Sequence, residues 1–196
     1  GSMLAWGLGL LDDLWTIRAR WKLLGQLSLG VLSVYSGFTI ESIEGPFFQK
    51  LDLGFWAIPL SILWIVGIIN AINLIDGLDG LASGISLVIL ITLSWLAHEM
   101  GKIELMLLMV ILIGSVVSFL SFNRPPASIF MGDSGSYFLG YLVALLSIWV
   151  CEKSTGTISL IPLLILAVPI IDTTFSIFRR FLKGIPFYSA DKDHLH

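Results

Sequence analysis

Long apolar runs separated by short polar segments dominate the chain. A membrane-spanning helix needs about 20 mostly apolar residues. Six runs come near that length, at residues 23–40, 55–75, 81–97, 103–122, 137–151 and 157–178. A seventh, Met3–Leu11, is only about half as long as a span requires. The pattern therefore predicts an all-α fold, a polytopic transmembrane helix bundle with six full spans and a truncated first helix.

The composition supports a membrane protein. Of 196 residues, 56% are hydrophobic and 13% are charged, and the mean hydropathy is +0.93. A soluble domain has roughly 25% charged residues. The first three residues, Gly1-Ser2-Met3, are typical of a cloning scar, so we expect residues 4–196 to form a single membrane-embedded core.

The connecting segments sort into two groups if each run crosses the membrane once. Segments 12–22, 76–80, 123–136 and 179–196 carry eight of the 11 Lys and Arg residues, and segments 41–54, 98–102 and 152–156 carry three. The positive-inside rule then places the first group in the cytoplasm. Its acidic residues are all Asp, whereas those of the other group are nearly all Glu. A short carboxylate side chain suits a fixed site for a hard cation, although Asp is also favoured in turns and caps.

Polar residues recur every third position where the run 55–75 ends: Asn70, Asn73, Asp76 and Asp79. On an α-helix this spacing keeps all four within about 180° of arc, so we expect one polar stripe. Polar groups at membrane depth usually face the bundle interior or an aqueous cavity. Alternatively, the two Asn side chains join helices and the two Asp side chains cap the next helix.

Two further segments of the same face carry acidic residues. Asp12 and Asp13 are adjacent, and their mutual repulsion would be relieved by a cation. Asp133 lies in Gly132–Ser136, small residues that open the next helix after Pro125 and Pro126. A helix N-terminus favours anions, and Mg²⁺ is commonly held by one or two carboxylates plus substrate phosphates. The alternative is a simple N-cap.

The tail "YSADKDHLH" adds two histidines, His194 and His196. Their spacing lacks the i, i+4 pattern of a zinc motif, so phosphate binding is the better interpretation. Asp172 is an intramembrane acid near the cytoplasmic end, and its default interpretation is functional or paired.

Four motifs in this order, "LDD", "NAINLIDGLDGLASG", "FNRPPASIFMGDSGS" and "DKDHLH", closely resemble those of the polyprenyl-phosphate N-acetylhexosamine-1-phosphate transferases. The resemblance spans nearly the whole chain. It implies a bacterial cell-membrane enzyme with a cytoplasmic active site that needs Mg²⁺. Its partners would be a UDP-sugar, a polyprenyl phosphate lipid and the membrane, with no nucleic acid.

The resemblance also implies roles for individual residues. Asp133 would be the metal ligand. The catalytic acids would be Asp12, Asp13 and Asp76, with the first two near the acceptor phosphate. Substrate would be bound by the following residues: Asn70, Asn73, Asp79, Asn123, Phe130, His194 and His196.

The tail "ADKDHLH" favours the branch that transfers N-acetylglucosamine 1-phosphate from UDP-N-acetylglucosamine to undecaprenyl phosphate, releasing UMP. Three alternatives stay open: a phospho-N-acetylmuramoyl-pentapeptide transferase, an inactive substrate-binding fragment and a membrane transporter. The family has further spans before "LDD" and after the tail. We therefore expect this chain to be truncated at both ends and to be less stable, or to form homo-oligomers in place of the missing helices.

Overall fold

The computed structural model describes residues 1–45, 48–151, 157–159, 166 and 171. The described helices are α1 (Ser2–Trp15), α2 (Ala19–Tyr35), α3 (Ala57–Ile75), α4 (Leu81–Glu99), α5 (Ile103–Asn123) and α6 (Gly132–Cys151). A 3₁₀ turn, η1 (Gly54–Trp56), leads into α3. Three short strands complete the described elements: β1 (Ser42–Gly45), β2 (Phe48–Asp52) and β3 (Thr157–Ser159).

The predicted polytopic helix bundle is confirmed. Among the described residues, four helical segments are long and apolar enough to cross a membrane: Gly54–Ile75, Leu81–Glu99, Ile103–Asn123 and Gly132–Val150. The first two helices differ from the expected runs in their boundaries. The first helix continues past residue 11 to Trp15, and the second begins at Ala19 and ends at Tyr35, with 17 residues. Exposed hydrophobic side chains such as Val88, Ile91 and Ile111 on α4 and α5 are the surface that lipid would cover.

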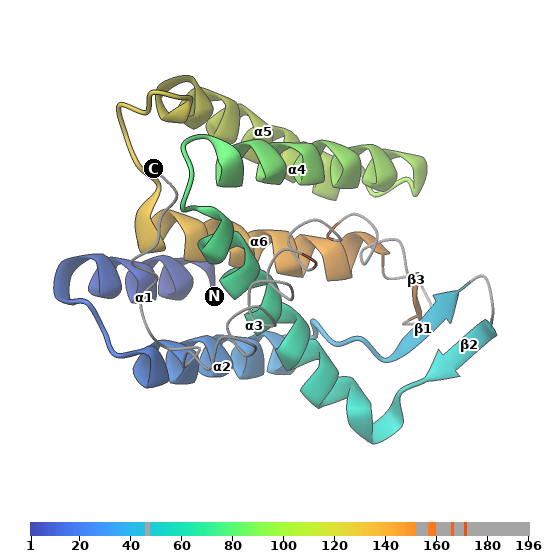
Figure 1. Cartoon of the computed structure of the whole chain (residues 1–196). Helices are drawn as coiled ribbons and strands as arrows, with labels where there is room; N and C mark the ends of the chain where they lie inside the picture. The colour runs from blue at the N-terminus through green and yellow to red at the C-terminus, as the bar shows by residue number, and fades with distance from the viewer. Residues whose placement is uncertain (46–47, 152–156, 160–165, 167–170, 172–196) are drawn as a thin grey trace.

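Helix α6 lies at the centre of the bundle and contacts α1, α3 and α4, as Figure 1 shows. Its buried side chains, including Tyr137, Val143 and Ala144, join the core formed by the isoleucines of α3. Gly140 permits the close approach, because a Cβ added there would lie 2.9 Å from the Ile69 Cα atom. The helix that carries Asp133 in its first turn is therefore packed against neighbouring helices on several sides.

A small sheet in the order β2-β1-β3 was not predicted. Strand β1 pairs antiparallel with β2, and it pairs parallel with β3 from Ser42 opposite Thr157 to Glu44 opposite Ser159. The expectation that a helical run begins at residue 157 was therefore wrong for 157–159, because those backbone groups bond to β1. The remainder of the expected run 157–178 lies outside the described residues, apart from Leu166 and Ile171.

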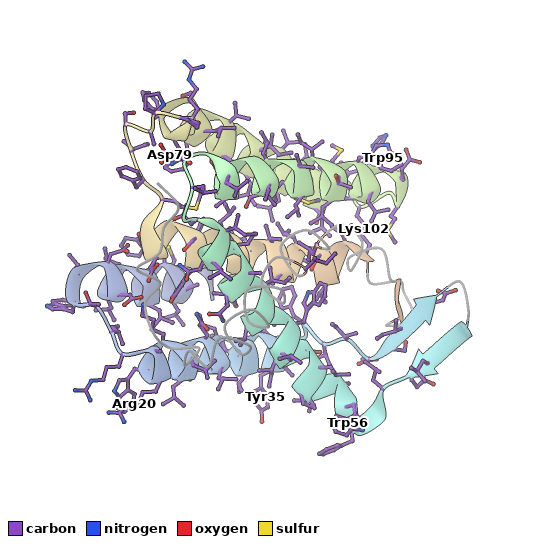
Figure 2. All side chains as sticks on the ribbon, in the orientation of Figure 1. Arg20, Tyr35, Trp56, Asp79, Trp95 and Lys102 are labelled. Atoms are coloured by element: carbon purple, nitrogen blue, oxygen red, sulfur yellow. The ribbon has the colours of Figure 1, made fainter. Side chains whose placement is uncertain are left out.

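The two ends of the bundle are built from different connecting segments. The connections after α1, after α3 and before α6 meet at the end where α6 begins, whereas the sheet and the α4–α5 connection lie where α6 ends (Figure 1). Figure 2 shows Asp79 and Lys102 toward these two opposite ends. The described segments of the first group, 12–22, 76–80 and 123–136, thus lie at one end, as expected if each run crosses once, and segment 179–196 lies outside the described residues.

Candidate active site

The end of α1 turns Asp12 into the protein. Thr16 adopts a left-handed conformation with φ of 48°, which ends the helix and brings the Ile17 N–H within 2.8 Å of Asp12 Oδ1. The buried carboxylate also forms an ion pair with the Lys22 ammonium. Burial alone would raise the pKa of Asp12, but the interactions with Asp133, Lys22 and the Ile17 N–H outweigh it and hold the pKa below its ordinary value. Asp12 is thus a fixed, ionised carboxylate.

Asp13 points to a different partner. Its Oδ1 accepts a hydrogen bond from the Asp133 N–H at 2.8 Å, and its Oδ2 accepts one from the Ser134 N–H at 3.0 Å. These are among the unsatisfied donors that every helix N-terminus presents. We expected this N-terminus to favour a substrate anion, and in the structure a carboxylate of the protein itself takes two of its donors.

Asp133 stands at the first turn of α6, between helices α2 and α3. Its Oδ1 accepts a hydrogen bond from Asn73 Nδ2 at 2.7 Å, and its Oδ2 lies 3.3 Å from Lys22 Nζ. The same Asn73 amide donates to the buried Ser136 hydroxyl at 3.0 Å. One side chain of α3 and one of α2 therefore fix the orientation of the expected metal ligand.

Asp76 follows the last residue of α3, is half-buried and lies near Asp133 and Asp13. We call Asp12, Asp13, Asp76 and Asp133 the carboxylate cluster. Burial and the negative charges of Asp133 and Asp13 raise the pKa of Asp76 to about 7, against a hydrogen bond from the Gly132 backbone that lowers it. Repelled carboxylates of this kind gather at functional sites more often than elsewhere. Added positive charge at this position would relieve the repulsion.

The expected helical stripe was wrong beyond residue 75. Helix α3 ends at Ile75, so Asp76 and Asp79 lie in the connection to α4, where Gly80 has φ of 73°. Asp79 Oδ2 accepts a hydrogen bond at 3.0 Å from the N–H of Ala127, which lies in the connection between α5 and α6. Asn70 instead points inward and donates to the buried Gln26 Oε1 at 2.6 Å. Only Asn73 and Asp76 reach the carboxylate cluster.

The remaining predicted residues are spread around this end. Asn123 is buried, and its amide joins three segments: its Oδ1 accepts from the Gly80 N–H at 3.1 Å and the Ser83 hydroxyl at 2.8 Å, and its Nδ2 donates to Ile129 O at 3.0 Å. Phe130 is 76% exposed beside them. Their roles in substrate binding stay predictions. His194, His196 and Asp172 lie outside the described residues.

Two site residues on α2 were missed by the motif analysis. Lys22 was counted among the basic residues of segment 12–22, which set topology and suit lipid phosphates, without a contact to the acids, and Gln26 was not singled out at all. The available signal was their spacing, because polar residues four apart in an apolar helix lie on one face. That face of α2 turns toward α3 and α6, where Lys22 contacts Asp133 and Gln26 accepts from Asn70.

The oxygen donors of this end suit a hard divalent cation. Within the described residues no group of three His, Cys, Asp or Glu side chains is placed to hold a metal. A site for Mg²⁺ needs only one or two carboxylates when substrate phosphates and water complete it. Asp133 and Asp76 repel each other, and together they provide two such carboxylates. Lys22, paired with Asp133, is the cation among these acids.

Known proteins with similar sequences are transferases. The chain is 46% identical to a protein of Bacillus subtilis named "Probable undecaprenyl-phosphate N-acetylglucosaminyl 1-phosphate transferase", over 100% of this chain and 55% of that protein. It is 34% identical to a phospho-N-acetylmuramoyl-pentapeptide-transferase of Listeria monocytogenes, over 74% of this chain and 49% of the other. A Streptococcus pyogenes protein of the same name is 35% identical over 76% of this chain and 47% of its own length.

The chain thus spans about half the length of the curated relatives it matches. Residues 1–151 match glycosyl transferase family 4, and this segment contains every described residue of the carboxylate cluster. This match over most of the chain shows that it belongs to glycosyl transferase family 4, a family of transferases, and its long apolar helices make it a membrane protein.

Proposed function

We propose that the chain is the membrane core of an enzyme that transfers N-acetylglucosamine 1-phosphate from UDP-N-acetylglucosamine to undecaprenyl phosphate and releases UMP. The observation that carries the proposal is the cluster of Asp12, Lys22, Asp76 and Asp133 at one end of a helix bundle. The name of the Bacillus subtilis relative supports the choice of donor and acceptor. The basic residues of the connecting segments favour the cytoplasmic face for this end.

Asp133 and Asp76 would hold Mg²⁺. When bound, the ion would neutralise negative charge on the diphosphate of the nucleotide sugar. Asn73 keeps Asp133 oriented through its 2.7 Å hydrogen bond, so the ligand carboxylate is fixed before substrate arrives. Fixed dipoles and charges of this kind supply much of the rate enhancement in phosphoryl transfer.

The reaction is a direct in-line displacement. An oxygen of the lipid phosphate attacks the phosphorus that carries N-acetylglucosamine, the bond from that phosphorus to the UMP oxygen breaks, and UMP leaves with the electron pair. A phosphate monoester with a second pKa near 6 is already mostly dianionic at pH 7, so the acceptor requires little deprotonation. Lys22, held between Asp12 and Asp133, provides a cation for the incoming phosphate.

The substrate contacts remain those implied by the resemblance. Asn73, Asp76, Asp79 and Asn123 would line the nucleotide pocket, and His194 and His196 would touch the diphosphate. Asn70 would also bind substrate. Phe130 is well suited to stacking on uracil because its ring is 76% exposed.

The second candidate is transfer of phospho-N-acetylmuramoyl-pentapeptide, which the names of the Listeria and Streptococcus relatives support. The same cluster would serve both donors, so the sugar alone separates the two. A transporter would need acidic residues through the depth of the membrane, whereas Asp12, Asp76 and Asp133 gather at one end of the described bundle and the half-buried Glu44 lies in the sheet at the other.

The test is UMP release by the detergent-purified chain with undecaprenyl phosphate, Mg²⁺ and either UDP-N-acetylglucosamine or UDP-N-acetylmuramoyl-pentapeptide. We expect release with the first donor, dependence on Mg²⁺ and loss in Asp133→Asn. Release only with the second donor would replace the proposed substrate. Binding of nucleotide without release from either donor would identify an inactive substrate-binding core.

A further inference from the structure

We propose that Asp13 is a positioning residue: its carboxylate caps the N-terminus of α6 and thereby holds Asp133 in place, while Asp12 alone of the pair faces the reacting groups. The proposal deepens the function proposed above and rests on it for the meaning of Asp133. It departs from the expectation that the two adjacent acids share one task at the acceptor phosphate.

Asp13 belongs to α1, and its side chain caps the N-terminus of another helix, α6. Its two oxygens accept from two successive backbone N–H groups, at 2.8 Å from Asp133 and 3.0 Å from Ser134. A carboxylate at this place satisfies donors that the helix itself leaves unpaired and interacts favourably with the helix dipole. Asp133, whose side chain is the expected metal ligand, is one of the two residues whose backbone is fixed.

A second contact holds the same two segments together. Gly9, one turn before Asp13 on α1, packs so closely on the first turn of α6 that an added Cβ would lie 2.2 Å from Asp133 O and 2.5 Å from the Ser134 Cα atom. At Gly132, which has φ of 65°, an added Cβ would lie 3.0 Å from Asp13 Oδ2. The backbone around Asp133 is therefore fixed by α1 from two positions.

The neighbouring acid, Asp12, has different partners from Asp13. Asp12 is buried, accepts one backbone hydrogen bond and pairs with the Lys22 ammonium beside Asp133. Asp13 has no ion pair among the described residues, and its two oxygens accept from backbone N–H groups of α6. The two carboxylates thus act on different sides of the end of α1.

The first arm of the test needs no substrate. Hydrogen–deuterium exchange of residues 131–136 is measured by mass spectrometry in the intact, detergent-purified chain for wild type, Asp13→Ala, Asp13→Asn and Lys102→Met. Loss of a cap should speed exchange there about fivefold or more in Asp13→Ala. Asp13→Asn keeps one acceptor oxygen and should be intermediate. Lys102→Met, at the other end of α6, should leave this segment unchanged.

The second arm measures UMP release per folded molecule against Mg²⁺ concentration. Displacement of Asp133 should raise the Mg²⁺ concentration for half-maximal rate in Asp13→Ala, with Asp13→Asn between it and wild type. A general loss of folded protein would not shift this concentration. Equal exchange in Asp13→Ala and wild type would overturn the capping role. An Asp13→Asn protein that keeps its protection but is as inactive as Asp13→Ala would overturn the proposal in favour of a chemical role. If wild type releases no UMP, the proposed function fails, and the exchange arm still decides the cap.

Discussion

The two ends of α6 satisfy the same physical requirement with opposite charges. At its N-terminus, Asp13 accepts from the Asp133 and Ser134 N–H groups. At its C-terminus, Lys102 Nζ donates to Trp149 O at 2.7 Å and Val150 O at 3.1 Å. Both charges complement the helix dipole. The ends differ in what surrounds these caps.

Around the N-terminus, the carboxylates are buried, mutually repelling or engaged by fixed donors. Around the C-terminus, Glu41, Asp52, Glu99 and Glu104 are exposed to solvent, and Glu44 on β1 is half-buried. Holding an acid away from water costs free energy unless other groups compensate it, whereas a solvated acid costs almost nothing. The comparison teaches that acid content alone does not mark a site in this protein. The mark is the constraint placed on each acid.

The largest expected effect comes from removing the acid proposed to bind the metal. Asp133→Asn should lower UMP release by about 1000-fold or more, because the proposed metal ligand and a fixed charge at the reacting phosphates would be lost together. The change should leave the bundle folded, as judged by thermal unfolding in detergent. Glu99→Gln, at the exposed end, is the matched control and should keep full activity. Comparable losses in both variants would erase the distinction between the two ends.

The next effect tests how α1 fixes the site. Gly9→Ala places a methyl group against the backbone of Asp133 and Ser134, with the added Cβ 2.2 Å from Asp133 O. We expect a loss of about 1–3 kcal/mol in the free energy of unfolding, typical of overpacking, together with reduced activity. Gly7→Ala on the same helix is the control, since a Cβ there meets nothing within 4 Å. It should be neutral or slightly stabilising, because Ala favours a helix over Gly. Thermal unfolding of both variants in one detergent decides the matter, and equal stability would contradict the close packing.

A smaller effect concerns the half-buried Asp76. Burial and the charges of Asp133 and Asp13 raise its pKa to about 7, from an ordinary value of 3.8. A carboxyl with a raised pKa in the folded state contributes stability that is complete below the ordinary pKa and is lost as the pH rises through the folded one. In EDTA, the midpoint of thermal unfolding should therefore fall between about pH 4 and pH 7. Asp76→Asn should flatten this dependence. Mg²⁺ should also flatten it if the ion binds the carboxylate, and an unchanged slope in Asp76→Asn would assign the dependence to another group.

The sequence predicted the bundle because each span needs only a long apolar run, which is a local property. It did not predict the sheet, since Ser42–Gly45 and Thr157–Ser159 are short and pair across more than a hundred residues. It placed Asp12, Asp13, Asn73, Asp76 and Asp133 at one end, and the structure brings them together. It could not assign the separate partners of Asp12 and Asp13, because these depend on how Gly9 lets α1 dock on α6. The same limit applied to Lys22, because its contact with Asp133, 111 residues away, depends on how α2 packs on the bundle.

The smallest effect lies at the other cap. Lys102→Met keeps the apolar stem but removes the ammonium from the carbonyl groups of Trp149 and Val150. We expect a loss of about 0.5–1 kcal/mol in the free energy of unfolding, the usual size of a charge at a helix C-terminus, and no loss of UMP release. Lys50→Met is the control, because its pair with Asp52 at 3.1 Å is largely exposed and such pairs contribute little. Thermal unfolding should rank Lys102→Met below Lys50→Met, with both fully active. A drop in activity for Lys102→Met would show that the two ends of α6 are coupled, so that the cap at the exposed end also supports the site at the other.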